Sequence, residues 1–474
     1  MRDQFIATLR KMVGEESVLT EPAELRTYDC DAYTLDKARP AAVVLPDSTE
    51  EVAQIVRLCN QYKVYFVARG AGTGLSGGAM AMADGIIIET ARMNRILEVD
   101  WVNRRVVAQA GCVNLAVSRA VAEDGLHFAP DPSSQGVSTI GGNVSENSGG
   151  PHTLKYGVTT NHVTGIKLVL PSGEVADLGG KCEVCNGYDL VGLITGSEGT
   201  LGVITEVTLK LTPLPVSVRT MLAIFDSVDS ATQTVSDIIA AGIIPAAIEM
   251  MDATITLAVE QAFHMGFPLD AGALLLIEVD GAEAGLDEDA DAVAAICQRN
   301  GAREIRRAAD SKERDLLWKA RKKGVGAAGR LAPSVVTQDG VIPRSKLPEV
   351  FREITAIASR NQVRIGNVFH AGDGNLHPCV MFDERDAEEV KRVLQANKEI
   401  LELCIKVGGS ITGEHGVGIE KVNFMPLLFS PVDLALMERI RSVFNPDDLC
   451  NPGKLLPTSK SCIETKWRPK AAAI

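Results

Sequence analysis

Histidine and glutamate side chains in two short glycine-flanked segments could hold a metal ion. Of the seven histidines, His370 and His377 enclose the sequence Ala-Gly-Asp-Gly-Asn-Leu, and β-like runs lie on both sides. We therefore expect a hairpin with one imidazole on each arm. The segment 413–416, Gly-Glu-His-Gly, adds a carboxylate at Glu414 and another imidazole at His415. Two imidazoles and a carboxylate, with positions left open for substrate, form the ligand set of a catalytic metal site.

Structural roles are the alternative for these residues, because a single histidine in a hairpin is usually structural. We expect Asp373 and Asn375 to shape the turn between the two imidazoles rather than to act chemically. His152 and His162 lie in or near the glycine-rich half of the chain, and we interpret them as structural, with cofactor contact as the alternative.

Glycine, at 43 residues, is concentrated in loops of the first half of the chain. The first loop, residues 69–78, contains a literal G-x-G-x-x-G at Gly72, Gly74 and Gly77. A dinucleotide-binding fold of the Rossmann type requires a helix to begin there. The sequence instead leads within a few residues into another strand-like run at 85–89, so we exclude that fold.

The glycines can still bind an anion, because successive backbone N–H groups without side chains line a concavity that accepts a pyrophosphate. Two more Gly/Ser/Thr loops follow at residues 130–150 and 196–202. Any one of them could be only a flexible turn. Three together suggest one extended anionic ligand with several contact points, and a flavin dinucleotide is long enough to need them.

The loop sequences resemble those of the vanillyl-alcohol oxidase family, which has a PCMH-type FAD-binding domain. The matching segments are RGAGTGLSGG, PDPSS, TIGGNVSENSGG, Tyr156-Gly157, GYDL, GSEGTLGVITEV and FNPDDLCNPGKLLP. Within the family the sequence is most similar to the FAD-linked D-2-hydroxy-acid dehydrogenases, a group that includes glycolate oxidase flavoprotein subunits and cytochrome-type D-lactate dehydrogenases. The resemblance, from about residue 40 to 457, implies an α+β fold in which a substrate cap with an antiparallel sheet accompanies the FAD-binding domain.

The resemblance also implies which residues contact FAD. Those for the pyrophosphate are Arg69, Gly70, Ala71, Gly72, Thr73, Gly74, Leu75 and Ser76. Those around the flavin are Pro130, Asp131, Ser134, Thr139, Gly141, Gly142, Asn143 and Ser145, and those towards the adenine are Glu198, Gly199 and Ile204, with Asn451 as a further contact. Relatives that tether FAD covalently have a histidine in the first loop; this chain has none there, which implies FAD bound without a covalent link.

The same resemblance assigns His370, His377 and Glu414 as ligands of a divalent metal, with zinc or manganese expected, and His415 as the general base. In this chemistry the metal holds the substrate's hydroxyl and carboxylate oxygens, so that both histidine ligands adjoin the substrate. His415 takes the hydroxyl proton, and the α-hydrogen leaves as hydride to the flavin.

Arg321 is the expected partner of the substrate carboxylate, since a guanidinium grips a carboxylate with two parallel hydrogen bonds. By pattern alone it is one of several basic residues in the charged run 312–323. The W-x-x-R spacing from Trp318 resembles the arginine that the family uses for this purpose, and only the resemblance singles it out.

The expected substrate is small. Relatives that act on D-2-hydroxyglutarate have a lysine before the region of Pro343, whereas residues 324–343 contain no lysine, and Thr337 and Gln338 stand there. A second carboxylate would then be buried without a partner, which is costly, so glycolate or D-lactate is favoured. Arg330 keeps the D-2-hydroxyglutarate alternative open.

The chain of 474 residues is long enough for two or three domains. We expect a helical segment at 1–37, the FAD-binding domain at 38–216, a substrate-binding cap with the metal and catalytic site at 217–425, and a segment returning to the FAD domain at 426–474. The predicted elements are strands near 41–45, 64–68, 85–89, 105–110, 162–170 and 203–211, helices near 49–59, 114–123, 315–321, 343–362 and 386–407, and an acidic loop at 280–292.

Composition limits the partners and the location. The net charge of −13 argues against nucleic acid as a partner, so an acidic substrate requires a locally positive or metal-containing site. The N-terminal residues predict an amphipathic helix rather than a signal peptide, and no apolar run reaches the roughly 20 residues that span a bilayer. Ten scattered cysteines fit reduced thiols in a cytoplasm. Cys182 and Cys185 are interpreted as a loop pair, with a metal site as the alternative.

Electrons must leave the reduced flavin, and no cysteine cluster here could hold iron and sulfur. A quinone, a cytochrome or partner flavin and iron–sulfur subunits are the candidate acceptors, and such partners could place a cytoplasmic protein at the inner membrane. Two other classes stay open: a metal-dependent hydrolase that uses the His/His/Glu site, and a flavin-dependent ether-lipid transferase.

Overall fold

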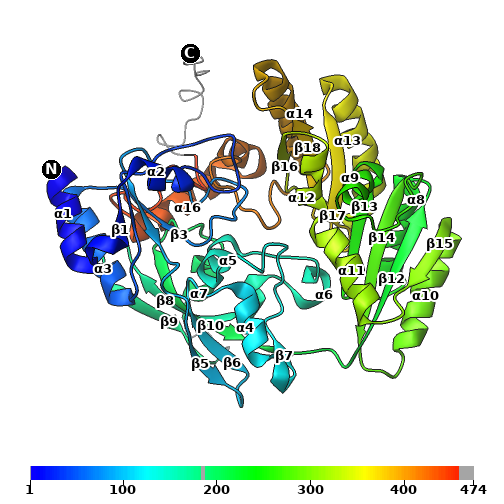
Figure 1. Ribbon diagram of the computed structural model, residues 1–474, viewed down its shortest axis with the longest axis horizontal. Coiled ribbons are helices and arrows are strands. Elements are labelled where there is room, and N and C mark those ends of the chain that lie inside the picture. The colour runs from blue at the N-terminus through cyan, green and yellow to red at the C-terminus, as the bar shows by residue number, and fades with distance from the viewer. Residues whose placement is uncertain (1, 183–186, 458–474) are drawn as a thin grey trace. The chain divides into compact units, whose positions relative to one another are not determined.

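The computed structural model describes residues 2–182 and 187–457, so Cys185 lies outside the described residues. The chain divides into two compact units (Figure 1). Of the described residues, the first unit contains those up to Gly149, those within Val158–Leu214 and those from Glu414 onwards. The second contains Gly150–Gly157 and Pro215–Gly413, so the chain passes from one unit to the other more than once.

A mostly parallel sheet begins the first unit. Its order is β1-β2-β4-β3, with β1 Val18–Leu19, β2 Ala42–Val44, β3 Phe66–Arg69 and β4 Ile86–Glu89. Helices α1 Arg2–Val13, α2 Pro22–Leu25 and α3 Thr49–Tyr62 accompany it. The apolar side chains of α1 and α3 pack into one core with the sheet.

Helix α3 forms where its sequence predicts it. The Ser48 hydroxyl accepts a hydrogen bond from the Glu51 N–H at 3.3 Å, and the Glu51 carboxylate accepts one from the Asp47 N–H at 2.9 Å. These contacts satisfy N–H groups that a helix start leaves without partners.

An antiparallel sheet completes the first unit, in the order β5-β6-β10-β8-β9. Its strands are β5 Ile96–Asp100, β6 Arg105–Gln109, β8 Val163–Val169, β9 Val175–Gly179 and β10 Val203–Lys210. The short strands β7 Leu126–His127 and β11 Thr212–Pro213 pair with each other. The remaining helices are α4 Asn114–Val121, α5 Ile140–Glu146, α7 Leu190–Ile194, α15 Met425–Leu428 and α16 Pro431–Phe444.

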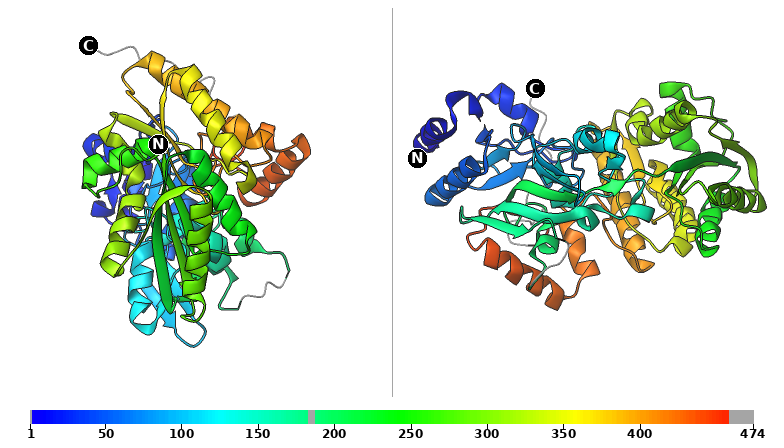
Figure 2. Two further views of the ribbon diagram at one scale, coloured as in Figure 1. Left: turned by 90° about the vertical axis from the view of Figure 1, so that its right-hand side faces the viewer. Right: turned by 90° about the horizontal axis from the view of Figure 1, so that it is seen from below.

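The second unit is built on one antiparallel sheet in the order β15-β12-β14-β13-β17-β18-β16 (Figure 2). The strands are β12 Ser217–Phe225, β13 Ala247–Asp252, β14 Ala273–Gly281, β15 Ala302–Arg307, β16 Ser334–Thr337, β17 Arg364–His370 and β18 Pro378–Phe382. The helices are α6 Thr153–Tyr156, α8 Val228–Ala240, α9 Ala253–Phe263, α10 Leu286–Arg299, α11 Ser311–Lys322, α12 Gly324–Ala327, α13 Leu347–Asn361 and α14 Ala387–Lys406.

The core of the second unit follows the alternation of its strands. Leu222, Ile224, Leu274 and Leu276 point to one face of the sheet, where they pack against α9 and α11. Their neighbours along each strand point to the other face, because successive side chains alternate in a strand. These neighbours, such as Ala223 and Leu275, are buried too, so both faces of the antiparallel sheet are covered, in agreement with the α+β class.

Two predicted loops contain helices. Helix α5 lies inside the second glycine loop, although Gly141 and Gly142 have low helix propensity. A side chain at Gly141 would crowd the backbone and Cβ of Ala110, so glycine is required there for packing. Helix α10 begins at Leu286, within the predicted acidic loop, because its buried apolar residues recur at helical spacing.

Among the residues that the structure describes, no helix is both long enough and apolar enough to cross a membrane.

Candidate active site

The two histidines of the H-x6-H segment lie on a hairpin, as predicted. His370 ends β17, His377 immediately precedes β18, and both side chains are buried. The Asp373 carboxylate accepts a hydrogen bond from the Asn375 N–H at 3.0 Å, which shapes the turn. The two imidazole rings are 5.0 Å apart and nearly perpendicular. Their potential ligand nitrogens lie within 4.8 Å of each other, close enough to share one ion.

A buried glutamate orients His370. Glu249 lies on the neighbouring strand β13, directly opposite His370, and its two carboxylate oxygens are 2.8 and 3.0 Å from the His370 Nδ1. When the Nδ1–H is donated to this carboxylate, the lone pair of the imidazole is on Nε2. A carboxylate in this position thereby fixes the tautomer in which a histidine binds a metal.

Arg321 shares that glutamate. Its guanidinium is buried, forms an ion pair with Glu249, and lies 3.4 Å from the His370 Nδ1 through Nη2. Its Nε has no hydrogen-bond partner among the residues that the structure describes. The predicted substrate arginine is therefore beside a predicted metal ligand, and it retains a donor for another group.

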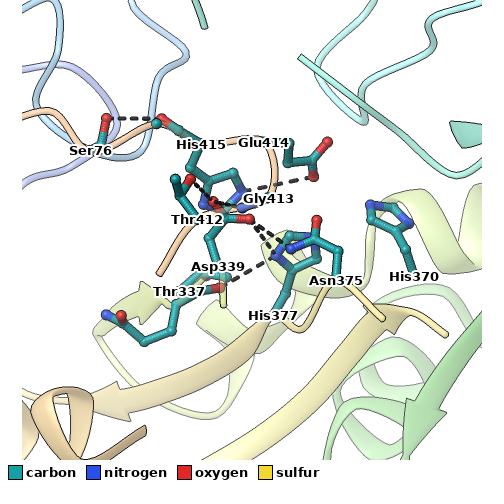
Figure 3. A network of polar contacts seen from close by, with 12 residues as sticks. Ser76, Thr337, Asp339, His370, Asn375, His377, Thr412, Gly413, Glu414 and His415 are labelled. Atoms are coloured by element: carbon teal, nitrogen blue, oxygen red, sulfur yellow. Dashed lines mark hydrogen bonds and ion pairs between the residues drawn. The ribbon is translucent and has the colours of Figure 1, made fainter. Parts of the chain in front are cut away.

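A second buried carboxylate, Asp339, lies next to His377 (Figure 3). Its Oδ1 is 3.9 Å from the His377 Nδ1 and accepts a hydrogen bond from the Asn375 amide at 2.9 Å. Its Oδ2 accepts from the Thr412 hydroxyl at 2.5 Å and from the Gly413 N–H at 3.0 Å. Asp339 thus connects a predicted ligand to the segment that leads directly to Glu414.

Glu414 directly follows Gly413, whose N–H donates to Asp339. The Cα of Glu414 is therefore about 3.8 Å from the Cα of Gly413. From this residue onwards the chain belongs to the first unit. The imidazole Nε2 of His415 lies 3.9 Å from the Glu414 carboxylate, and the Ser76 hydroxyl donates to the carbonyl oxygen of His415 at 2.9 Å.

The predicted cofactor loops meet one another in the first unit. A Cβ on Gly70 would overlap the hydroxyl of Thr139, so the first loop packs directly on the second. The Glu198 N–H donates to the carbonyl oxygen of Ser145 at 2.8 Å, which joins the second loop to the third. The Asn451 amide donates to the carbonyl oxygen of Glu198 at 2.7 Å and to that of Gly78 at 3.1 Å.

Several buried polar atoms of the second loop have no partner among the described residues. They are the hydroxyl oxygens of Ser138 and Thr139 and the amide nitrogen of Asn143. A buried donor or acceptor without a partner costs free energy, so these atoms are suited to a polar ligand. The loop therefore fits the polar groups of FAD.

Some predicted cofactor residues have other partners for their side chains. The guanidinium of Arg69 is buried, donates to the carbonyl oxygen of Cys30 at 2.8 Å, and lies 3.9 Å from Glu89. Burial raises the pKa of Glu89 to about 7, although the charge of Arg69 opposes the shift. Ile204 on β10 packs in the hydrophobic core, and the carboxylate of Glu198 accepts from backbone N–H groups beyond Glu414.

The other predicted cofactor residues lie in loops or at a helix start. The loop after β3 contains Ala71, Gly72, Thr73, Gly74 and Leu75. The turn before α5 contains Pro130, Asp131 and Ser134, and Gly142 lies in the first turn of that helix. Gly199 lies in the loop before β10.

Glu278, a residue absent from our predictions, is the centre of another buried polar cluster. It lies on β14 and accepts from Trp318 Nε1 at 2.7 Å, from Arg314 Nε and Nη2 at 2.8 Å each, and from the Thr220 hydroxyl at 2.6 Å. His152 Nε2 is 3.3 Å away. Burial alone would raise the pKa of Glu278, but the hydrogen bonds and charges of Arg314 and His152 outweigh it and hold the pKa well below its usual range.

Glu249 and Glu278 share a sequence signal that could have revealed them. Each is an acidic residue inside a strand of otherwise apolar residues, AIEMM and LLIEV. An acidic residue is rarely buried unless it is paired, so its presence in such a run predicts a buried cation or histidine elsewhere in the chain.

Comparison with known proteins gives matches over nearly the whole chain. The pattern of the C-terminal domain of FAD linked oxidases matches residues 214–455, and that of an FAD binding domain matches residues 40–179. The glycolate oxidase subunit GlcD of Escherichia coli (strain K12) is 45% identical over 463 residues, which cover 98% of this chain and 93% of that protein. A D-lactate dehydrogenase of Anaerostipes hadrus is 32% identical and covers 95% of each chain.

A solved structure has the same fold. That of p-cresol methylhydroxylase with substrate bound superimposes with a TM-score of 0.80 at 16% identity, covering 95% of this chain and 96% of that one. The expectation of a PCMH-type fold is confirmed.

Proposed function

The chain belongs to the family of FAD-linked oxidases, and we propose that it oxidises a small 2-hydroxy acid, glycolate or D-lactate, to the 2-oxo acid. The names of its relatives support the substrate class, since one is a glycolate oxidase subunit and another a D-lactate dehydrogenase. The single observation that carries the proposal is the buried group of Arg321, Glu249 and His370, which combines a carboxylate-binding cation with an oriented imidazole.

Two groups that the chain binds supply the chemistry that side chains lack. FAD, held without a covalent link by the glycine loops and the polar atoms of Ser138, Thr139 and Asn143, provides an acceptor for two electrons. A divalent cation, zinc or manganese, held by His370, His377 and Glu414, provides Lewis acidity.

The side chains then have separate tasks. Arg321 binds the substrate carboxylate through the guanidinium atoms that Glu249 does not use. His415 accepts the proton of the substrate hydroxyl at a ring nitrogen as the α-hydrogen leaves with its electron pair. Glu249 and Asp339 hold the two histidines of the hairpin in the orientation that ligation requires.

The surroundings of β16 favour a small substrate. Thr337 and Gln338 are buried at the end of this strand and carry no charge. Arg330, the residue that could accept a second carboxylate of D-2-hydroxyglutarate, is exposed. We therefore prefer glycolate or D-lactate to a diacid.

The electrons must pass to an external acceptor. The GlcD relative is named as a subunit, which supports partner polypeptides as one route, and a quinone or cytochrome is another. A cytoplasmic location, with attachment to the inner membrane through such partners, stays a prediction.

Anaerobic mixing of the purified yellow protein with 2-hydroxy acids of both hands tests the function. We expect loss of the oxidised flavin absorbance with glycolate or D-lactate and formation of one 2-oxo acid per flavin. A flavoprotein that none of these acids reduces would contradict the proposal and would favour a reaction without net redox change. A protein unable to bind flavin would favour the hydrolase.

A further inference from the structure

The segment 414–420, which we call the base loop, contains His415 and lies entirely outside helices and strands. A loop without regular structure must have its N–H groups satisfied by other means. The two oxygens of the Glu198 carboxylate do this for consecutive residues. Oε1 accepts from the Val417 N–H and Oε2 from the Gly418 N–H, each at 2.7 Å.

Ser76 holds the same loop from the first glycine loop. Its hydroxyl donates to the carbonyl oxygen of His415 at 2.9 Å, and its own carbonyl oxygen accepts from the N–H groups of Ile419 at 2.9 Å and Glu420 at 3.2 Å. The backbone on both sides of Gly416 is therefore hydrogen-bonded to residues of the cofactor loops.

The packing requires glycine in this loop. A Cβ on Gly416 would overlap the carboxylate of Glu146, and one on Gly418 would overlap the carbonyl group of Ser76. Both glycines also have positive φ, 82° and 51°. The loop is consequently close-packed against its supports, and a side chain at either position would displace the residues beside it.

The burial, backbone conformation and charged neighbours of Glu198 are suited to this contact. This residue is 4% exposed and has a φ of +53°, which is uncommon for a residue other than glycine and indicates that the surroundings impose it. Two fully buried lysines compensate its charge: Lys421, which also donates to the carbonyl oxygen of Gly416 at 3.0 Å, and Lys454, which donates to that of Met80 at 2.6 Å.

We propose that Glu198 is a positioning residue: it fixes the base loop so that the imidazole of His415 meets the substrate hydroxyl, and Ser76 assists it. Its carboxylate therefore acts on the loop rather than on the cofactor. This inference rests on the proposed function of His415. In the second unit, Asp339 supports the residues before the loop in the same manner through Thr412 and Gly413.

Hydrogen exchange tests the hydrogen bonds directly and needs no bound cofactor. In the wild-type apoprotein we expect slow exchange of the Val417 and Gly418 amides, despite their position outside helices and strands. In Glu198→Gln the side chain keeps its shape but has one acceptor oxygen, and its NH2 group faces an N–H group. We expect exchange of these amides to quicken by roughly tenfold or more, since bonds to a charged acceptor are strong.

The rate of flavin reduction tests whether the support of the base loop by Glu198 affects catalysis. With flavin content unchanged, we expect the rate of anaerobic reduction by the preferred acid to fall by about 100-fold in Glu198→Gln, as misplacement of a catalytic group does. The half-saturating substrate concentration should change little, because Glu198 does not bind substrate. Ser76→Ala removes one hydrogen bond and should show the same pattern with a smaller decrease. Glu206→Gln, which changes a carboxylate paired with Lys167 on the neighbouring strand, is the control.

Each outcome decides the inference. Fast exchange of both amides in the wild-type protein would overturn it, even if Glu198→Gln failed to fold. Increased exchange in Glu198→Gln or Ser76→Ala with an unchanged reduction rate would show that the hydrogen bonds are structural only, and would also overturn it. If no hydroxy acid reduces the wild-type flavin while the amides behave as expected, the proposed function fails and the support of the loop by Glu198 stands.

Discussion

Buried carboxylates contact the predicted functional side chains of this protein or the backbone beside them. Glu249, Asp339 and Glu198 are each less than 5% exposed, and each accepts two or more hydrogen bonds or ion pairs. A buried charge is tolerable only when such partners compensate its desolvation. Because the partners of each carboxylate are fixed in number and direction, the residues that they contact are fixed as well.

Replacement of Glu249 tests this view. In Glu249→Gln the side-chain oxygen can still accept the His370 Nδ1–H, but the negative charge that balances Arg321, and that would strengthen ligation of the predicted metal, is lost. We expect metal affinity to fall by roughly 10- to 100-fold while FAD remains bound. Titration of metal-free protein, followed by elemental analysis, measures the affinity. Glu353→Gln, at an exposed ion pair with Arg360, is the matched control, and equal affinities in both variants would contradict the role of Glu249.

Replacement of His415 tests the base. His415→Asn should retain flavin but lower the rate of its reduction by about 100-fold or more, the usual contribution of a general base. His264→Asn is a suitable control, because His264 is exposed and its backbone is left-handed, a conformation that asparagine accepts. Stopped-flow absorbance under anaerobic conditions measures both rates. A His415→Asn protein that is reduced at the wild-type rate would remove this residue from the mechanism.

At the level of elements, local patterns in the sequence predict the hairpin that carries His370 and His377 but not the residues that support it. The turn of Asp373 to Asn375 and the flanking strands follow from residues within a few positions of His370. Glu249 lies 121 residues away in the sequence, and only the pairing of β13 with β17 brings it to His370. No local pattern specifies such a pairing.

Helices α5 and α10 lie where the sequence predicts loops, and they too show that local patterns alone do not determine every element. Helix α5 has two glycines, which disfavour a helix in isolation, but packing of Gly141 on Ala110 decides the conformation. Helix α10 has Asp287, Glu288 and Asp289 in its first turn, where negative charge favours the helix dipole. Acidic residues by themselves are compatible with a loop, and the buried apolar residues that follow at helical spacing determine the helix.

The cluster around Glu278 joins several elements of the second unit, and its loss should be costly. Glu278→Ala leaves Arg314 and Trp318 of α11 and His152 of the segment before α6 without their acceptor. We expect the free energy of unfolding of this unit to fall by about 3–5 kcal/mol. Urea denaturation measures the loss, with Glu283→Ala as the control at an exposed pair with Arg219, where a change within about 1 kcal/mol is expected. Equal effects would contradict the role of Glu278.

The depressed pKa of Glu278 predicts a dependence of stability on pH. Since the folded-state pKa lies below the unfolded-state value of about 4.3, the carboxylate stabilises the fold above that pH. This stabilisation is lost progressively as the pH falls below about 4.3 towards the folded-state pKa. We expect Glu278→Gln, which cannot titrate, to lose less stability than wild type over this range. Urea midpoints measured at several acidic pH values give the comparison, and parallel losses would exclude Glu278 as the source.

At the scale of the whole molecule, an acidic protein must bind two anions, the cofactor and the substrate. The net charge is −13, yet the guanidinium of Arg321, the predicted partner of the substrate carboxylate, is almost wholly buried. Cations removed from water act over short distances with little screening by salt. The overall charge therefore does not prevent anion binding, because the relevant positive charges are internal and local.

Reversible binding of FAD is the prediction for the whole chain. The first glycine loop contains no histidine, so acid precipitation should release all the flavin into the supernatant. Addition of FAD to the apoprotein at about 100 times its Kd should raise the free energy of unfolding of the first unit by about 2.7 kcal/mol. Hydrogen exchange in β6 and β10 reports on this unit. Flavin that remains with the precipitated polypeptide would contradict the prediction.

The residues Gly150–Gly157 pack with the second unit, although the chain on both sides of them belongs to the first. A gene fragment that stops at Leu214 would encode this octapeptide without the sheet that receives it, and would omit the part of the first unit that begins at Glu414. Neither half can thus be produced by simple truncation. Anyone who wishes to crystallise one of them alone must delete internal stretches and rejoin the remaining pieces with linkers.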